Sequence, residues 1–185
     1  IWGRILLSAA VVAGTAMLES PAACADDFDW KDGKWRLELS GFAGYRSGRR
    51  SRTGDFGFAG SVEYEVPLAS RLTFGIKAYP LFFYDQDDAG EDTLFGAGVG
   101  PELRVYSKGA EHRGFFAELG TAVLATVGRF DGNSGAVNLL IEGGLGYKFE
   151  RNWHVAVKFR HISNVGFAAR NSGLNGLGLA FGYSF

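Results

Sequence analysis

The chain has 185 residues, a length that corresponds to one domain, and its composition shows no break that would mark a second. Its formal net charge of -1 indicates neither a polybasic surface nor an acidic tail, so no nucleic-acid partner is expected. With 28 glycines, 15% aromatic residues and 4 prolines, the composition favours many glycine-punctuated strands over helices.

The first 25 residues differ in kind from the rest of the chain. Arg4 precedes an apolar run, and the small-residue site Ala23-Cys24-Ala25 ends the segment. This order is typical of a cleaved secretory signal peptide, so residues 1–25 are predicted to be removed and residues 26–185 to form the mature domain. Cys24 is the only cysteine, and without it the mature domain has no disulfide or thiol chemistry.

Eight segments of the mature domain alternate apolar and polar residues over about ten positions, which is the period and length of a membrane-spanning strand. Short turns and long loops alternate between them. The predicted strands cover residues 34–45, 56–66, 72–84, 95–106, 115–127, 137–149, 153–163 and 175–185. The sequence therefore predicts an all-β fold, an eight-stranded antiparallel transmembrane β-barrel of the outer-membrane type.

The polar faces of these segments carry as many acidic as basic residues. The acids are Glu38, Glu63, Glu65, Glu102, Glu118 and Glu142, and the bases are Arg36, Lys77, Arg104, Lys148, Lys158 and Arg160. Because buried charges persist only when they are paired, this balance predicts the packed ionic interior of a small closed barrel. A soluble periplasmic ligand-binding barrel, apolar inside and charged outside, has the same alternation. The signal peptide, the even strand count and the final aromatic Phe185 favour the membrane barrel.

Aromatic residues collect near the ends of the predicted strands, where they are expected to form an interfacial girdle. This set is Trp35, Tyr45, Tyr84, Tyr147, Trp153 and Tyr183. In the third segment, simple alternation from Leu72 predicts that Phe82 and Tyr84 point outward.

The seventh segment presents polar side chains on the face that should contact lipid. Lys158 and Arg160 must point into the barrel, so His161 and Ser163 point outward. With the mature amino end in the periplasm, the long loops lie outside and both residues lie near the outer rim. Asn175, on the next strand, has the outward parity and is expected near the same rim.

Two interpretations of these outward polar groups remain open. A histidine two residues from a serine on one strand face can take the hydroxyl proton and activate the oxygen as a nucleophile. Asn175 would then orient the other ring nitrogen of His161. Alternatively, the three side chains only mark the headgroup level at the membrane edge. No metal or other cofactor is expected, because His112 and His154 fall at a turn or strand end and no cluster has metal-ligand spacing.

The last 25 residues carry a motif that can be compared with a known family. It consists of His161-x-Ser163-Asn164-x-Gly166, then Asn171-x-Gly173, then an alternating strand that ends in phenylalanine. This pattern resembles the lipid A 3-O-deacylase (PagL) or acyloxyacyl hydrolase family of outer-membrane barrels.

The resemblance implies a serine esterase that removes the ester-linked 3-O-acyl chain of lipid A with a Ser/His/acid triad on the barrel exterior. By position, Ser163 is the nucleophile, His161 the base, and Asn164 an oxyanion donor together with nearby backbone N–H groups. Gly166, Asn171 and Gly173 would shape the loop. The implied partner is lipid A, or lipopolysaccharide, in the outer leaflet of the cell outer membrane. The sequence does not reveal whether the barrel forms a homodimer.

The sequence departs from the family pattern at one position. Where the pattern has glutamate, twelve residues after the serine, this chain has Asn175, and no acid follows Glu150. An asparagine can orient a histidine but supplies no charge to stabilise an imidazolium. Three interpretations follow: a weaker enzyme, an acid taken from a loop such as Asp131, or a catalytically silent structural or adhesive barrel whose basic loop, residues 46–52, carries the function.

Overall fold

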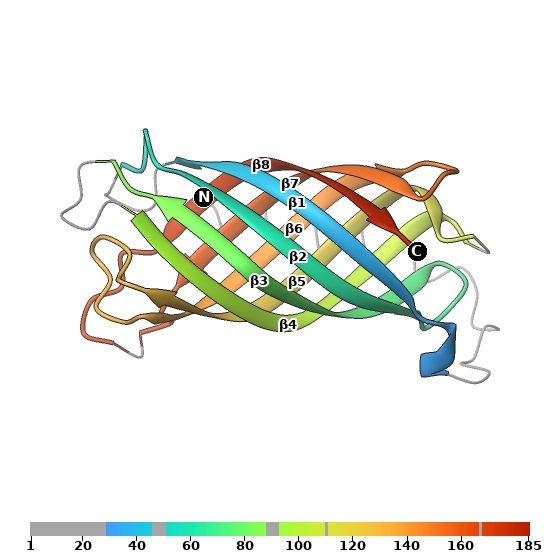
Figure 1. Cartoon of the computed structure of the whole chain (residues 1–185), viewed down its shortest axis with the longest axis horizontal. Coiled ribbons are helices and arrows are strands. Elements are labelled where there is room, and N and C mark those ends of the chain that lie inside the picture. The colour runs from blue at the N-terminus through green and yellow to red at the C-terminus, as the bar shows by residue number, and fades with distance from the viewer. Residues whose placement is uncertain (1–28, 46–50, 88–92, 110, 167) are drawn as a thin grey trace, which may run out of the picture.

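The computed structural model describes residues 29–45, 51–87, 93–109, 111–166 and 168–185. Within them, eight strands form a closed antiparallel barrel in which β8 pairs with β1 (Figure 1). The elements are η1 (Trp30–Asp32), β1 (Lys34–Tyr45), β2 (Phe56–Pro67), β3 (Leu72–Asp85), β4 (Thr93–Lys108), β5 (Arg113–Val127), β6 (Val137–Lys148), β7 (Trp153–Ser163) and β8 (Leu174–Ser184). The predicted fold class is confirmed. The predicted signal peptide, residues 1–25, lies outside the described residues.

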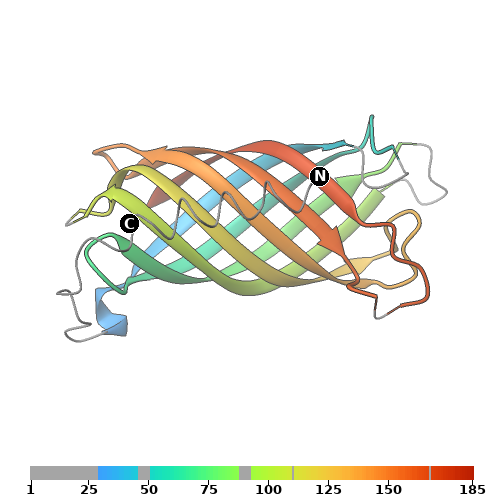
Figure 2. The same ribbon diagram turned by 180° about the vertical axis from the view of Figure 1, so that it is seen from behind.

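The connections between strands alternate in length, as the sequence predicts. Both views of the ribbon show the three short turns and η1 at one end of the barrel and the four long loops at the other (Figures 1 and 2). The long loops connect β1 to β2, β3 to β4, β5 to β6, and β7 to β8. Outer-membrane barrels have short periplasmic turns and longer extracellular loops, so the long-loop end is the extracellular end. No helix within the described residues is long and apolar enough to span a membrane.

The outer wall of the barrel is apolar and the inside is charged. Leu119, Leu145 and Leu179 are 60%, 69% and 69% exposed, whereas Lys158 and Arg160 are each 1% exposed. An apolar surface on every strand is stable only against hydrocarbon, because in water it would form a continuous patch far larger than soluble monomers expose. This polarity is that of a membrane barrel, and the soluble ligand-binding alternative is wrong.

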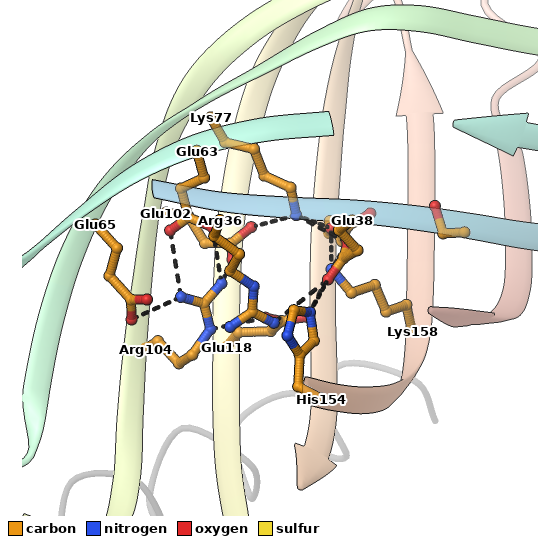
Figure 3. Close-up of polar contacts among 12 residues, drawn as sticks. Arg36, Glu38, Glu63, Glu65, Lys77, Glu102, Arg104, Glu118, His154 and Lys158 are labelled. Atoms are coloured by element: carbon orange, nitrogen blue, oxygen red, sulfur yellow. Dashed lines mark hydrogen bonds and ion pairs between the residues drawn. The ribbon is translucent and has the colours of Figure 1, made fainter. Parts of the chain in front are cut away.

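The interior of the barrel contains a network of ion pairs, part of which Figure 3 shows. Glu142 accepts hydrogen bonds from Lys77 at 3.0 Å and from Lys158 at 2.9 Å, and it also pairs with Arg160. Glu38 lies 2.6 Å from the same Lys158 ammonium. Charges removed from water are tolerated only when such partners surround them. All twelve charged residues that the alternation places inside are buried, which confirms the prediction for each.

His154 joins this network, although the sequence reasoning placed it only at a strand end. Its ring is fully buried, and Nε2 lies 3.2 Å from the Glu38 carboxylate. The opposite residue on β8 is Gly182, where a side chain would overlap the imidazole, since an added Cβ would lie 2.3 Å from the ring. The glycine therefore makes the space that the histidine occupies.

The outward prediction for Phe82 and Tyr84 is wrong, because both side chains are fully buried inside the barrel. The register between β3 and β4 shifts between Tyr79 and Phe82, and the two intervening residues, Pro80 and Leu81, are both exposed. Such a bulge adds one residue to a strand and exchanges the two faces beyond it. Proline has no N–H for the ladder and is tolerated at a bulge. Tyr84 is therefore not part of the aromatic girdle.

Replacement of Glu142 by alanine tests the ionic interior. The change leaves Lys77, Lys158 and Arg160 with one carboxylate fewer, so the free energy of unfolding should fall by about 3–5 kcal/mol. Urea unfolding in lipid vesicles, followed by tryptophan fluorescence, measures the difference. Glu150→Ala, at an exposed position in the turn between β6 and β7, is the matched control and should change stability by less than about 0.5 kcal/mol. Equal stability of the two variants would contradict the pairing.

Candidate active site

Strand β7 places His161 and Ser163 on the outer wall, as its alternation predicts. Arg160 and Ile162 point inward and are buried, whereas His161 and Ser163 are both partly exposed on the opposite face. The neighbouring residues on β6 are Ile141, opposite His161, and Leu139, opposite Ser163. The two polar side chains therefore stand on an apolar surface near the extracellular end of β7.

Asn175 meets His161 directly across the β7–β8 pair. The two residues are register partners, and the Asn175 Oδ1 atom lies 2.7 Å from His161 Nδ1. Because an amide oxygen only accepts hydrogen bonds, Nδ1 carries the proton and donates it to Asn175. In the neutral ring Nε2 is then the unprotonated nitrogen, which is the form that a general base needs.

Ser163 is the next outward residue after His161. Outward residues two apart on a strand have Cα atoms about 7 Å apart, a distance that a serine and a turned imidazole can bridge. In the described part of the chain no hydrogen bond joins the Ser163 hydroxyl to the His161 ring. Catalytic hydrogen bonds are often long or poorly aligned before substrate binds, and the spacing of the two residues along β7 is compatible with such a pair.

The loop after Ser163 is held by two asparagines. Asn164 is buried, its side-chain amide donates to the Arg170 carbonyl at 2.7 Å, and its Oδ1 accepts from the Gly166 N–H at 3.1 Å. The Asn164 N–H donates to Asn171 Oδ1 at 3.3 Å. In this arrangement both polar ends of the Asn164 side chain bind the loop itself. Asn171 shapes the loop, whereas Asn164 would have to exchange partners to serve as an oxyanion donor.

Three of the described residues of this loop have positive φ angles. Gly166 at 81° and Gly173 at 49° adopt them without steric cost, which explains glycine at both positions. Val165 also has a positive φ, 54°, and a β-branched side chain in this region costs about 1–3 kcal/mol. The strained residue lies two positions after Ser163, and sequence reasoning gave no signal for it.

Asp131, the loop acid considered in place of Asn175, lies between β5 and β6 and pairs with Arg52. Its carboxylate is 3.9 Å from the Arg52 guanidinium. Arg52 itself is buried, so it adds no charge to an exposed basic loop, and residues 46–50 of that loop lie outside the described residues. Among the described residues no group of three histidine, cysteine or acidic side chains could hold a metal ion.

A groove with a volume of about 390 Å³ lies on the outer wall beside these residues. Gly41 and Ala43 on β1 form its floor, and it is lined by Gly41, Phe42, Ala43, Phe56, Gly57, Phe58, Leu177, Gly178 and Leu179. Gly41 pairs with Phe58 on one side and with Leu179 on the other, so two small residues lie between large apolar walls. Leu177 is the next outward residue after Asn175, so the groove begins beside the polar cluster.

Comparison with known proteins identifies the family. A family model described as lipid A 3-O-deacylase (PagL) matches residues 23–184. The chain belongs to the PagL family. Among solved structures, the crystal structure of the outer membrane enzyme PagL has a TM-score of 0.63 and 19% sequence identity, over 80% of this chain and 98% of that one. The crystal structure of Neisserial surface protein A (NspA) has a TM-score of 0.52 and 13% identity, over 83% and 97%. No curated protein matches the chain.

Membership in the PagL family confirms the resemblance that the terminal motif indicates. This membership agrees with the apolar outer wall of the barrel. The protein is an outer-membrane barrel of a lipid A deacylase family. The family match extends over all eight strands, whereas the motif lies within β7, the following loop and β8. The likeness to the two solved structures concerns the fold alone, and the roles of individual residues rest on the geometry of the candidate site.

The hydrogen bond between His161 and Asn175 predicts a single ring tautomer. Nitrogen-15 NMR of the protein in detergent micelles should show His161 protonated on Nδ1, because Asn175 Oδ1 accepts that proton. In Asn175→Ala the ring should become a mixture of tautomers. His161→Gln identifies the signal among the three histidines. Unchanged ring chemical shifts in Asn175→Ala would contradict the bond.

Proposed function

We propose that this barrel removes the 3-O-acyl chain of lipid A through an acyl-enzyme formed on Ser163, with His161 as the base and Asn175 as its orienting partner. The observation that carries the proposal is the 2.7 Å contact between His161 Nδ1 and Asn175 Oδ1 on the outer wall. It leaves Nε2 free to accept a proton beside Ser163. Membership in the PagL family supports lipid A as the substrate.

The reaction follows from the chemistry of these side chains. His161 Nε2 takes the Ser163 hydroxyl proton as Oγ attacks the ester carbonyl carbon, and the bond from that carbon to the sugar oxygen breaks. The imidazolium returns its proton to the sugar oxygen. A water molecule, deprotonated by the same nitrogen, then attacks the acyl carbon. The bond from that carbon to Ser163 Oγ breaks, the imidazolium returns the proton to Oγ, and the fatty acid is released. The ester of an outer-leaflet lipid lies at the depth of the rim, so the substrate need not leave the membrane.

Asparagine as the third member of the proposed triad weakens catalysis but keeps the orientation of the histidine. Asn175 holds the ring in the useful tautomer, but it is neutral and does not stabilise the imidazolium that forms during attack. Rate enhancement then depends on orientation and on donors for the oxyanion. A slow esterase is therefore the expected form of the activity.

The groove beside Asn175 suits one acyl chain of the substrate. Its floor is made of Gly41 and Ala43, and its walls are aromatic and aliphatic, so a hydrocarbon chain can lie along it in contact with protein on both sides. The groove is lined by Leu177, one outward position from Asn175, and this nearness supports a bound chain whose end lies next to the reacting ester.

Loss of the nucleophile should abolish deacylation. Mass spectrometry of lipid A from cells that express the wild-type chain should show loss of one ester-linked acyl chain, and Ser163→Ala should reduce the rate by about a thousandfold or more. Asn175→Glu should raise kcat by about tenfold or more, because a carboxylate stabilises the imidazolium. Ser70→Ala, in the turn between β2 and β3, is the control. An unchanged acyl pattern with both the wild type and Asn175→Glu would support the silent structural barrel instead.

Filling the groove should slow the reaction on long acyl chains only. Ala43→Trp covers the floor and is expected to lower kcat/KM for lipid A by about ten- to a hundredfold, while hydrolysis of a short soluble ester is unchanged. Val123→Trp, an exposed apolar position on β5, is the matched control for an added lipid-facing indole. Equal effects of Ala43→Trp on the long and the short ester would show that the groove does not hold the acyl chain.

A further inference from the structure

Arg52 connects three extracellular loops through one buried side chain. It lies in the loop between β1 and β2 and is 3% exposed. Its Nη2 donates to the carbonyl of Asp131, in the loop between β5 and β6, at 2.6 Å. The same nitrogen donates to the carbonyl of Gly173, at the end of the loop between β7 and β8, at 3.4 Å.

The charge of Arg52 is balanced where it lies. Asp55 is 3.6 Å from Nη1 and is itself 4% exposed. Asp55 in turn accepts a hydrogen bond from the Tyr84 hydroxyl at 2.6 Å and from the Asp87 N–H at 3.0 Å. A buried, paired guanidinium of this kind is costly to remove, because the Asp131 and Gly173 carbonyls would each lose one donor and Asp55 would lose its cation.

The segment that Arg52 holds leads directly to the candidate site. Gly173 is two residues before Asn175. Just upstream, the Ser172 N–H donates to Asn133 Oδ1 at 3.2 Å and the Arg170 N–H to Ser134 Oγ at 2.9 Å. The end of the loop is thus bound by the neighbouring loop on one side and by Arg52 on the other.

The other neighbour of Asn175 is tied to the same residues. Tyr45 on β1 is the register partner of Asn175, and the preceding Gly44 N–H donates to the Asp55 carbonyl at 2.8 Å. The Asp55 N–H donates to the Arg52 carbonyl at 3.1 Å. The ends of β1 and β8 that flank Asn175 are therefore both connected to Arg52.

We propose that Arg52 is a positioning residue for the hydrolase: it fixes the beginning of β8 so that Asn175 Oδ1 stays on His161 Nδ1. This inference rests on the proposed function. A planar guanidinium offers several donors in a fixed fork, so it can hold the Asp131 and Gly173 carbonyls while facing Asp55. A lysine keeps the charge but presents a point-like ammonium on a flexible stem and cannot hold the same set in one geometry. Displacements of about 1 Å at an orienting group reduce rates by up to about a hundredfold.

Steady-state kinetics of Arg52→Lys in the full chain test the proposal. The expected result is a fall in kcat of about ten- to a hundredfold with KM nearly unchanged, because the substrate-contacting residues remain in place. Arg52→Lys should cause no further loss in an Asn175→Ala background, since Arg52 acts through Asn175. Arg151→Lys, at an exposed position in a periplasmic turn, is the matched control. Additive losses in the double variant, or an unchanged kcat in Arg52→Lys, would overturn the proposal.

A second readout separates this inference from the proposed function. In Arg52→Lys the Nδ1-bound proton of His161, followed by nitrogen-15 NMR in micelles, should be lost or exchange faster, whether or not the protein deacylates lipid A. If the wild type has no activity and this signal still depends on Arg52, the proposed function fails and the positioning role stands. If the signal is the same in wild type, Arg52→Lys and Arg52→Gln, the positioning role fails. The difference in SDS-gel mobility between boiled and unboiled samples identifies any variant that does not fold.

Discussion

The structure depends on the pairing of charges inside a closed barrel. Glu142 shared by Lys77, Lys158 and Arg160 shows the principle: strands β1 to β7 each contribute charges that are tolerated only because other strands supply their partners. Closure of β8 on β1 brings these strands together and leaves no unpaired edge. The outer face of the same wall is apolar, and the bilayer is its solvent.

The position of the candidate site is a consequence of this constraint. Lys158 and Arg160 point inward and pair with acids, so the odd-numbered residues of β7 point outward. His161 and Ser163 belong to this outward set and reach the lipid surface without any special turn of the chain. A β-strand exposes alternate residues by its geometry, which allows the proposed nucleophile and base to lie on a rigid wall. The loops contribute the rest, because they hold the beginning of β8, where Asn175 lies.

Much of this arrangement could be predicted from sequence, since strand period and charge are local properties. The alternation placed Lys158 inside and His161 outside, and the shared parity of Asn175 placed it near the same rim. Prediction failed where a long-range pairing changes the local pattern. The bulge at Pro80 and Leu81 reverses the faces of β3, so Phe82 and Tyr84 turn inward. His154 was overlooked because its acceptor, Glu38, is distant in sequence, and the space for its ring depends on Gly182.

The sequence by itself determined the barrel, its strand count, the polarity of its interior and the candidate catalytic residues, because alternation and charge balance are local properties of the chain. Only the tertiary structure decided which of these residues meet. The contact between His161 and Asn175 depends on the register of β7 against β8, and the burial of Arg52 depends on three loops that converge at one end of the barrel. Register and loop convergence arise from contacts between distant segments, and no local pattern in the chain encodes them.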